Sequence, residues 1–136
     1  MKKLIKAIVI IVLLGVGLYM FIFSATSGAV KVVEQQLTYI SEGQMEEAYN
    51  LTSPAFQVET SLEDFENFMS TYPALRNYES ISFDSREINT ANIAILKGEL
   101  KAKDGTFSPV EYQLEKDDEG WKILGLDLKP GSLRDN

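Results

Sequence analysis

The chain has 136 residues, with 13 Lys and Arg against 20 Asp and Glu, a net charge of −7, and neither cysteine nor histidine. The lack of cysteine excludes disulfides, thiolate metal sites and cysteine nucleophiles. The lack of histidine excludes imidazole bases and histidine-ligated metals. An acidic chain also lacks the basic face that nucleic-acid binding requires. We therefore expect no nucleic-acid partner, no metal site and no cofactor.

Residues 1–27 are predicted to form a membrane anchor. An unbroken apolar run of 17 residues extends from Ala7 to Phe23, and residues 4–23 would cover about 30 Å as a helix that rises ~1.5 Å per residue. Three lysines precede the run: Lys2, Lys3 and Lys6. Aromatic residues stand where a belt would meet the outer headgroups: Tyr19, Phe21 and Phe23. The alternative is a cleaved signal peptide, although the apolar core of such a peptide usually has only about 7–15 residues.

The distribution of lysines predicts the orientation of this single-pass anchor. Positively charged flanks stay in the cytoplasm, so the N-terminus is expected there and the rest of the chain on the periplasmic or cell-surface side. Residues 28–130 have a suitable length for one domain. We expect a short linker over residues 24–29 and a polar tail over 131–136.

Helical patterns with capping signals are predicted over residues 29–72. The expected helices cover 29–41, 44–51, a turn that begins at Ser53-Pro54, and a stretch from Ser61 to Tyr72. Gly43 would end the first helix in a left-handed conformation. The stretch Ser61-Leu62-Glu63-Asp64 resembles a capping box, and Pro73 would stop the helix that follows it.

After Pro73 the apolar residues alternate, which predicts antiparallel strands. The expected strands cover residues 78–85, 92–103, 107–116 and 121–128. Asp104-Gly105 is a hairpin signal. A loop of Asp104, Gly105 and Thr106 would pair Leu96 with Leu114 and keep the apolar side chains on one face.

Helices followed by four antiparallel strands predict an α+β fold. Four features make the chain similar to small domains of the nuclear-transport-factor-2-like (cystatin-like) superfamily: Glu42–Tyr49, Ser53–Phe56, a Ser-led helix with Phe65 and Phe68, and Gly120–Ile123. The resemblance implies helices packed on a curved four-stranded antiparallel sheet in a cone. The superfamily includes isomerases, dehydratases and partner-binding domains, so the resemblance does not select one function.

Enzymes of that superfamily place an acid, a histidine or a tyrosine inside the cone. No acid of this chain matches a catalytic motif, although Asp84 and Asp127 lie next to apolar strand residues and are candidates for a buried base. An aspartate that faces water at a strand end is the more common arrangement. Five tyrosines are candidates for a pocket hydroxyl: Tyr39, Tyr49, Tyr72, Tyr78 and Tyr112. Without a catalytic constellation, we expect a protein that is not an enzyme.

Aromatic residues are the candidates for a small apolar ligand pocket: Phe56, Phe65, Phe68, Tyr72 and Trp121. The alternative is that these side chains fill the space between helices and sheet. In that case we expect Phe65, Phe68 and Trp121 to be mostly buried.

The last strand predicts self-association through one face of the sheet. A four-residue turn over Asp117–Gly120 would pair Ile123 with Leu114 and place leucines on the otherwise charged face. The candidates for self-association are Ile93, Ile95, Leu124, Leu126 and Leu128. An exposed apolar patch of this kind usually marks a contact surface, which predicts a homodimer through this face. The alternative is that the C-terminal tail or the curvature of the strand covers these leucines within one chain.

Residues 32–75 contain eight acidic residues and no basic one. This helical face is predicted either to be a solvated surface kept away from anionic lipids or to dock a basic protein partner. We expect a membrane-anchored, non-catalytic, extracytoplasmic domain that binds a protein partner or a small apolar ligand. The alternative is a cone-pocket isomerase or lyase that uses a buried aspartate and a tyrosine.

Overall fold

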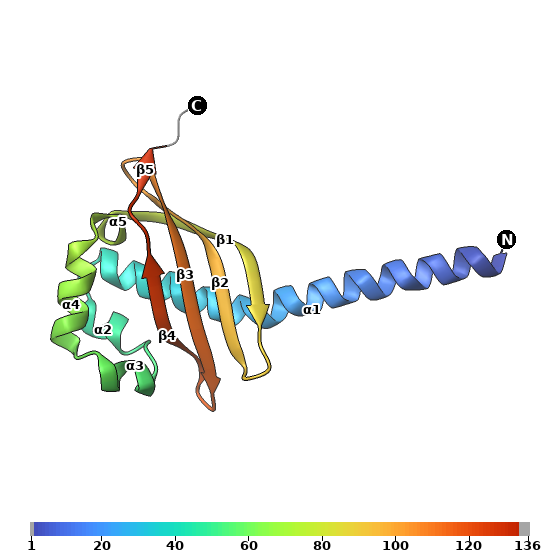
Figure 1. Ribbon diagram of the computed structural model, residues 1–136, viewed down its shortest axis with the longest axis horizontal. Coiled ribbons are helices and arrows are strands. Elements are labelled where there is room, and N and C mark those ends of the chain that lie inside the picture. The colour runs from blue at the N-terminus through green and yellow to red at the C-terminus, as the bar shows by residue number, and fades with distance from the viewer. Residues whose placement is uncertain (1, 134–136) are drawn as a thin grey trace.

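A long helix crosses one face of an antiparallel sheet in the computed structural model, which describes residues 2–133 (Figure 1). The helices are α1 (Lys2–Ser41), α2 (Met45–Tyr49), α3 (Pro54–Glu59), α4 (Leu62–Thr71) and α5 (Pro73–Arg76). The strands are β1 (Tyr78–Ile88), β2 (Ile93–Ala102), β3 (Thr106–Asp117), β4 (Gly120–Leu128) and β5 (Ser132–Leu133). The sheet order is β1-β2-β3-β4, and β5 pairs with the start of β3. The predicted α+β class and four-stranded antiparallel sheet are confirmed.

The prediction of a short linker over residues 24–29 is wrong, because α1 continues without a break from Lys2 to Ser41. The small residues of this stretch lie where the helix meets the rest of the domain. Thr26 and Ala29 have no exposed surface, and a Cβ atom on Gly28 would come within 3.2 Å of the Trp121 ring. Small side chains therefore serve close packing here rather than flexibility.

Within the described residues, no helix is both long enough and apolar enough to cross a bilayer. The side chains of residues 13–24 are outside that description. The aromatic belt predicted at Tyr19, Phe21 and Phe23 falls in this stretch.

The predicted capping residues of the helices are confirmed, although α1 begins at Lys2 rather than at residue 29 and α2 spans Met45–Tyr49 rather than 44–51. Gly43 ends the first helix with φ at 79°, and the Gln44 N–H donates to the Tyr39 carbonyl. Ser53 and Ser61 accept hydrogen bonds from the third residue after each, at 3.1 and 3.2 Å, and so cap α3 and α4. Pro73 stops α4, as predicted, and then occupies the first position of α5.

The core lies between α1 and the sheet face that α1 crosses, which we call the inner face. Helix α1 contributes one stripe at helical spacing: Ala29, Val33, Leu37 and Ile40. The strands contribute alternate residues: Phe83, Ala94, Leu96, Leu100, Val110, Tyr112, Leu114, Ile123 and Leu128. The residues between them point to the opposite face, the outer face, which faces the viewer in Figure 1.

The hairpin between β2 and β3 has a three-residue loop, as predicted, but the loop lies one residue earlier. Lys103, Asp104 and Gly105 form the loop, and Leu96 pairs with Tyr112 rather than with Leu114. Gly105 has φ at 90°, and a three-residue hairpin needs its left-handed residue at the third position. Each residue of β2 therefore pairs with a β3 residue two positions from the predicted one. A shift of two residues keeps every side chain on its predicted face of the sheet.

The hairpin between β3 and β4 corrects the prediction in a second way. Asp117 pairs with Gly120, so the loop has two residues, and Ile123 pairs with Leu114 as expected. A bulge at Leu124 then shifts the pairing, so that Leu126 lies opposite Tyr112 and Leu128 opposite Val110. The prediction that Leu126 and Leu128 lie on the outer face is therefore wrong.

The polar tail predicted over residues 131–136 contains a short strand. Ser132 and Leu133 pair with Phe107 and Thr106 as the short strand β5. Residues 134–136 lie outside the described part of the chain.

Candidate functional site

An apolar pocket lies between α3, α4 and β4. Its volume is about 310 Å³, and we call it the aromatic pocket. Its lining residues come from three separate elements: Phe56, Thr60, Asp64, Phe65, Phe68, Met69 and Leu126. Phe65 and Met69 are buried and form the base, whereas Phe68 retains 39% of its surface exposed. The pocket therefore combines a fixed apolar base with an aromatic ring that water reaches.

Three aromatic rings hold the base of the aromatic pocket in place. The Phe65 ring centroid lies 5.5 Å from that of Tyr49 and 6.1 Å from that of Phe56. The Tyr49 hydroxyl donates a 2.7 Å hydrogen bond to the Thr60 carbonyl, which ties α2 to the end of α3. Tilted and edge-on ring pairs of this kind are favourable, so the base is preorganised rather than loosely filled.

The prediction that Phe68 is mostly buried is wrong. Its ring contacts Tyr72, with centroids 5.0 Å apart, and both residues lie on one side of α4 and its C-terminal cap. Phe65 and Met69 occupy the helix positions that face the core. Phe68 directly precedes Met69 and is turned from it by about 100° around the helix axis, so it lies at the edge of the apolar stripe. An apolar pattern alone does not show which edge of the stripe remains exposed.

A second cavity, of about 350 Å³, continues from Tyr72 past α5 to the C-terminal segment. Residues of α5 and its cap, the β2–β3 loop, β3, β4 and the segment after β4 line it: Tyr72, Pro73, Ala74, Asp104, Thr106, Ser108, Leu128, Lys129, Pro130 and Gly131. Leu126 belongs to the aromatic pocket and Leu128 to the second cavity. The two cavities therefore lie beside alternate residues of β4.

The structure brings four of the five predicted pocket residues to these cavities. Phe56, Phe65 and Phe68 line the aromatic pocket, and Tyr72 lines the second cavity. Trp121 lies elsewhere, against Gly28, with the Lys116 ammonium 5.7 Å from its ring centre.

Sequence reasoning missed two apolar members of the aromatic pocket. Met69 follows Phe65 by one helical turn, a spacing that could have identified it. The bulge at Leu124 brings Leu126 to the inner face, and the isolated glycine beside it, Gly125, is a signal that could have indicated such a bulge.

The charged residues of the two helices beside the aromatic pocket are all acidic, and one of them, Asp64, lines the pocket. Exposed carboxylates lie along α3 and α4 at Glu59, Glu63, Asp64 and Glu66. No basic residue occurs from residue 32 to residue 75, which includes α2, α3 and α4. The pocket therefore presents an apolar surface with one carboxylate, on helices that carry no positive charge.

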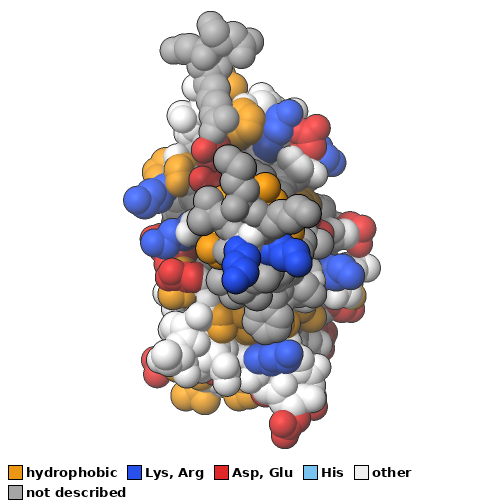
Figure 2. All heavy atoms as spheres, turned by 90° about the vertical axis from the view of Figure 1, so that its right-hand side faces the viewer, with side chains coloured by type: hydrophobic (Ala, Val, Ile, Leu, Met, Phe, Trp, Pro, Cys, Tyr) orange, Lys and Arg blue, Asp and Glu red, His pale blue; other side chains and the backbone are white. Residues whose placement is uncertain are grey.

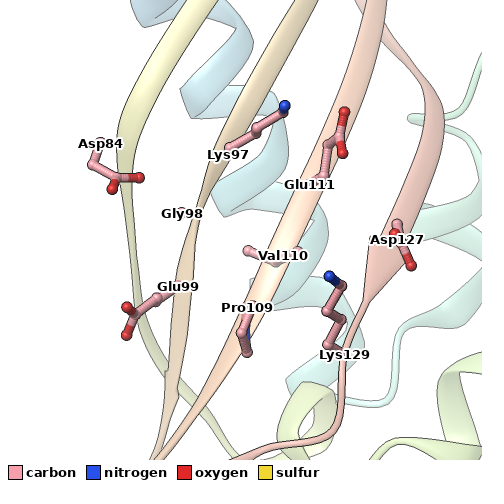
Figure 3. A pocket seen from close by; sticks show the side chains of 9 residues that line it. All are labelled: Asp84, Lys97, Gly98, Glu99, Pro109, Val110, Glu111, Asp127 and Lys129. Carbon is pink, nitrogen blue, oxygen red and sulfur yellow. The ribbon is translucent and has the colours of Figure 1, made fainter.

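A groove of about 350 Å³ lies on the outer face of the sheet (Figure 3). Charged residues of both signs line it: Asp84, Lys97, Glu99, Glu111, Asp127 and Lys129. Figure 3 shows these side chains standing apart along the strands rather than pointing toward one centre. Among the described residues, no three acidic side chains cluster closely enough to hold a metal ion.

The two candidate bases do not meet a tyrosine hydroxyl. Asp84 and Asp127 are exposed on the outer face, whereas Tyr112 is fully buried on the inner face. Burial raises the pKa of Tyr112, and the nearby Tyr78 adds to this rise. The Tyr112 hydroxyl has no hydrogen-bond partner among the described residues. The structure thus does not assemble the buried aspartate–tyrosine pair expected for an enzyme.

The apolar patch predicted for self-association is smaller than expected. Ile93, Ile95 and Leu124 are partly exposed, whereas Leu128 is buried and Leu126 lines the aromatic pocket. A homodimer through the outer face stays a prediction.

No curated protein and no solved structure matches the chain. A domain of unknown function, DUF4864, matches residues 24–133, which is most of the chain, and the protein therefore belongs to that family.

Proposed function

We propose that this protein is a non-catalytic, membrane-anchored binding domain that recognises a partner through the aromatic pocket. The observation that carries this proposal is the exposed ring of Phe68 at the mouth of a preorganised apolar pocket. Exposed aromatic side chains next to a buried apolar base are typical of sites that hold an anchor residue of a partner. The fold that supports the site is proposed to be of the nuclear-transport-factor-2-like type, with α1 crossing the sheet.

The apolar run from Ala7 to Phe23 supports a membrane anchor with the domain on the extracytoplasmic side. The N-terminal part of α1 projects away from the sheet, and α2, α3 and α4 lie on the far side of the domain (Figure 1). Viewed from the N-terminal end, acidic and basic side chains are interspersed around α1 (Figure 2). This arrangement would keep the acid-only helices away from anionic lipid headgroups.

The enzyme alternative has less support. A general base and a general acid must both contact the reacting part of one substrate. Asp84 and Asp127 lie on the opposite face of the sheet from Tyr112, so they cannot share a substrate with its hydroxyl. The aromatic pocket contains one carboxylate, Asp64, and this residue is exposed at the rim.

Site-specific photocrosslinking of the full-length protein in intact cells tests the binding proposal. A photoreactive phenylalanine analogue at Phe68 should give a discrete adduct with a partner. The matched control is the same analogue at Val58 of α3, which is 84% exposed and does not line the pocket. Equal adduct patterns at both positions, or none at Phe68, would contradict the proposal.

Extraction of the same cells tests the anchor. The intact chain should stay with membranes after washing with alkaline carbonate. A mature protein that begins near Gly28 would show instead that the segment is a signal peptide.

A further inference from the structure

Strand β4 forms one edge of the sheet, and only part of this edge is covered. The Ile123 N–H donates to the Leu51 carbonyl at 2.9 Å, and the Ile123 carbonyl accepts from the Ser53 N–H at 2.8 Å. Thr52 thus lies beside Ile123 as a parallel bridge. Beyond Ile123, no other described segment makes a backbone hydrogen bond to the outer edge of β4.

The direction of the uncovered backbone groups follows from the register. The Lys129 N–H donates to the Pro109 carbonyl, and Asp127 pairs with Glu111. In an antiparallel ladder the hydrogen-bonding residues alternate, so the N–H and C=O groups of Leu126 and Leu128 point away from β3. A short open edge therefore remains at these two residues, with backbone donors and acceptors available.

The two cavities lie beside this open edge. Leu126 lines the aromatic pocket, and Leu128 lines the second cavity. The two leucines are two residues apart, which in a strand corresponds to about 7 Å. Alternate side chains of a neighbouring extended chain have the same spacing, so they could enter the two cavities in turn.

The opposite edge of the sheet differs. Strand β1 carries a bulge between Phe83 and Ser85 and exposed acids at Glu79, Asp84 and Glu87. Bulges and charges are features that protect edges against pairing with other chains. The stretch of β4 after Leu124 has one charged residue, Asp127, which points to the outer face.

We propose that the open edge of β4 binds an extended segment of a partner polypeptide. The segment adds to the sheet as a further strand and places two alternate apolar side chains in the aromatic pocket and the second cavity. This inference rests on the proposed function, since it specifies how the partner occupies the aromatic pocket. Lys or Arg residues flank the apolar side chains of the segment, because Asp64 lines the pocket and every charged residue of α3 and α4 is acidic.

Charge also decides against a second copy of this chain as the occupant. Pairing of two β4 edges would bring α3 and α4 of one copy toward the same helices of the other, and all charged residues of these two helices are acidic. Like charges across an interface oppose association, whereas a basic segment complements them.

The test uses the full-length protein in lipid nanodiscs and a defined probe, the peptide KTLTLTK. Two further peptides carry backbone N-methyl groups, one at both leucines and the other at the first two threonines. Strand addition uses the N–H groups of alternate residues only. One methylated peptide should therefore bind about tenfold more weakly than the parent, because two hydrogen bonds are lost, while the other keeps its affinity. The parent peptide should also slow hydrogen exchange at the Leu126 and Leu128 amides.

Each other outcome has a definite meaning. If both methylated peptides bind as well as the parent and Phe68→Ala still weakens binding, the strand is overturned and the pocket proposal stands. No binding of the parent peptide at about 1 mM overturns the inference, while the photocrosslink at Phe68 tests the function independently. Slower exchange at Leu126 and Leu128 on raising the protein concentration alone identifies a second copy as the occupant and also overturns it.

Discussion

The two faces of the sheet are built from the same strands but have opposite environments. Leu96 and Leu100 of β2 have no exposed surface on the inner face, while Lys97 between them is exposed on the outer face. Alternation along each strand accounts for this difference. The bulge at Leu124 interrupts the alternation and gives Leu126 to the inner face. The consequence of a substitution therefore depends on the local register as much as on the residue type.

Neighbouring residues on opposite faces should show the largest contrast. Leu96→Ala should lower the free energy of unfolding by about 2–5 kcal/mol, since it empties a fully buried site. Ile95→Ala should cost only about 1 kcal/mol, because Ile95 lies partly exposed on the outer face. Urea unfolding of both variants measures the difference, and similar costs would contradict the assignment of faces.

The two strand glycines provide the next test. A Cβ atom on Gly98 would overlap the Ser82 carbonyl oxygen and lie 2.8 Å from the Phe83 Cα, because the bulged strand β1 approaches closely there. Gly98→Ala should therefore cost about 1–3 kcal/mol through a forced backbone shift. Gly125→Ala is the matched control, with open space at the site, and should melt within a few degrees of the parent protein.

A buried hydroxyl on the inner face should give a smaller effect of opposite sign. Tyr112→Phe removes a hydroxyl that has no partner among the described residues, so the variant should be more stable at pH 7 by about 1 kcal/mol. A less stable variant would show that the hydroxyl is satisfied in solution.

The pH dependence of the same variant follows from the shifted pKa. Burial raises the pKa of Tyr112, so the folded state keeps a proton that the unfolded state releases above its ordinary pKa of about 10. The contribution of this residue to stability is complete below that value and falls as the pH rises further. Thermal melts between about pH 9 and 11, a range that brackets the ordinary tyrosine pKa, should show a smaller decline of the melting temperature for Tyr112→Phe than for the parent protein.

The smallest effect is expected for an ion pair at the exposed surface. The Lys101 ammonium lies 3.6 Å from the Glu79 carboxylate, with both side chains more than 40% exposed. Glu79→Gln should cost about 0.2–1 kcal/mol, and salt should reduce the difference. A cost comparable to that of Leu96→Ala would invalidate the contrast between the faces.

The sequence predicts those parts of the fold that depend on local chemistry. Gly43, Ser53 and Ser61 mark helix ends because each satisfies backbone groups within a few residues. The strands follow from alternation, and the need to keep the apolar side chains on one face gives the correct loop length in the hairpin between β2 and β3. The loop is misplaced by one residue because two alignments bury the same face, and only the left-handed glycine position distinguishes them.

The candidate site depends on contacts between distant segments and is predicted less completely. Aromatic composition identifies Phe56, Phe65 and Phe68, which the structure brings together. It does not identify Leu126, whose position depends on the bulge at Leu124, and the local signal for that bulge is the isolated glycine that follows, Gly125. The small residues near Gly28 resemble a linker in sequence, because a helix that packs closely and a flexible joint use the same residue types.

Because α1 is continuous, the number of residues before the sheet determines both the distance of the domain from the N-terminus and its rotation about the helix axis. Each helical residue advances about 1.5 Å and turns the chain by about 100° around the axis. Because no break separates Lys2 from Ser41, one residue inserted before Ala25 would rotate the open edge of β4 by that angle relative to an anchored N-terminus. Seven inserted residues would restore the azimuth to within about 20° while raising the domain. With the membrane anchor and the partner segment proposed above, the phase of this helix would therefore set the direction in which the open edge of β4 faces.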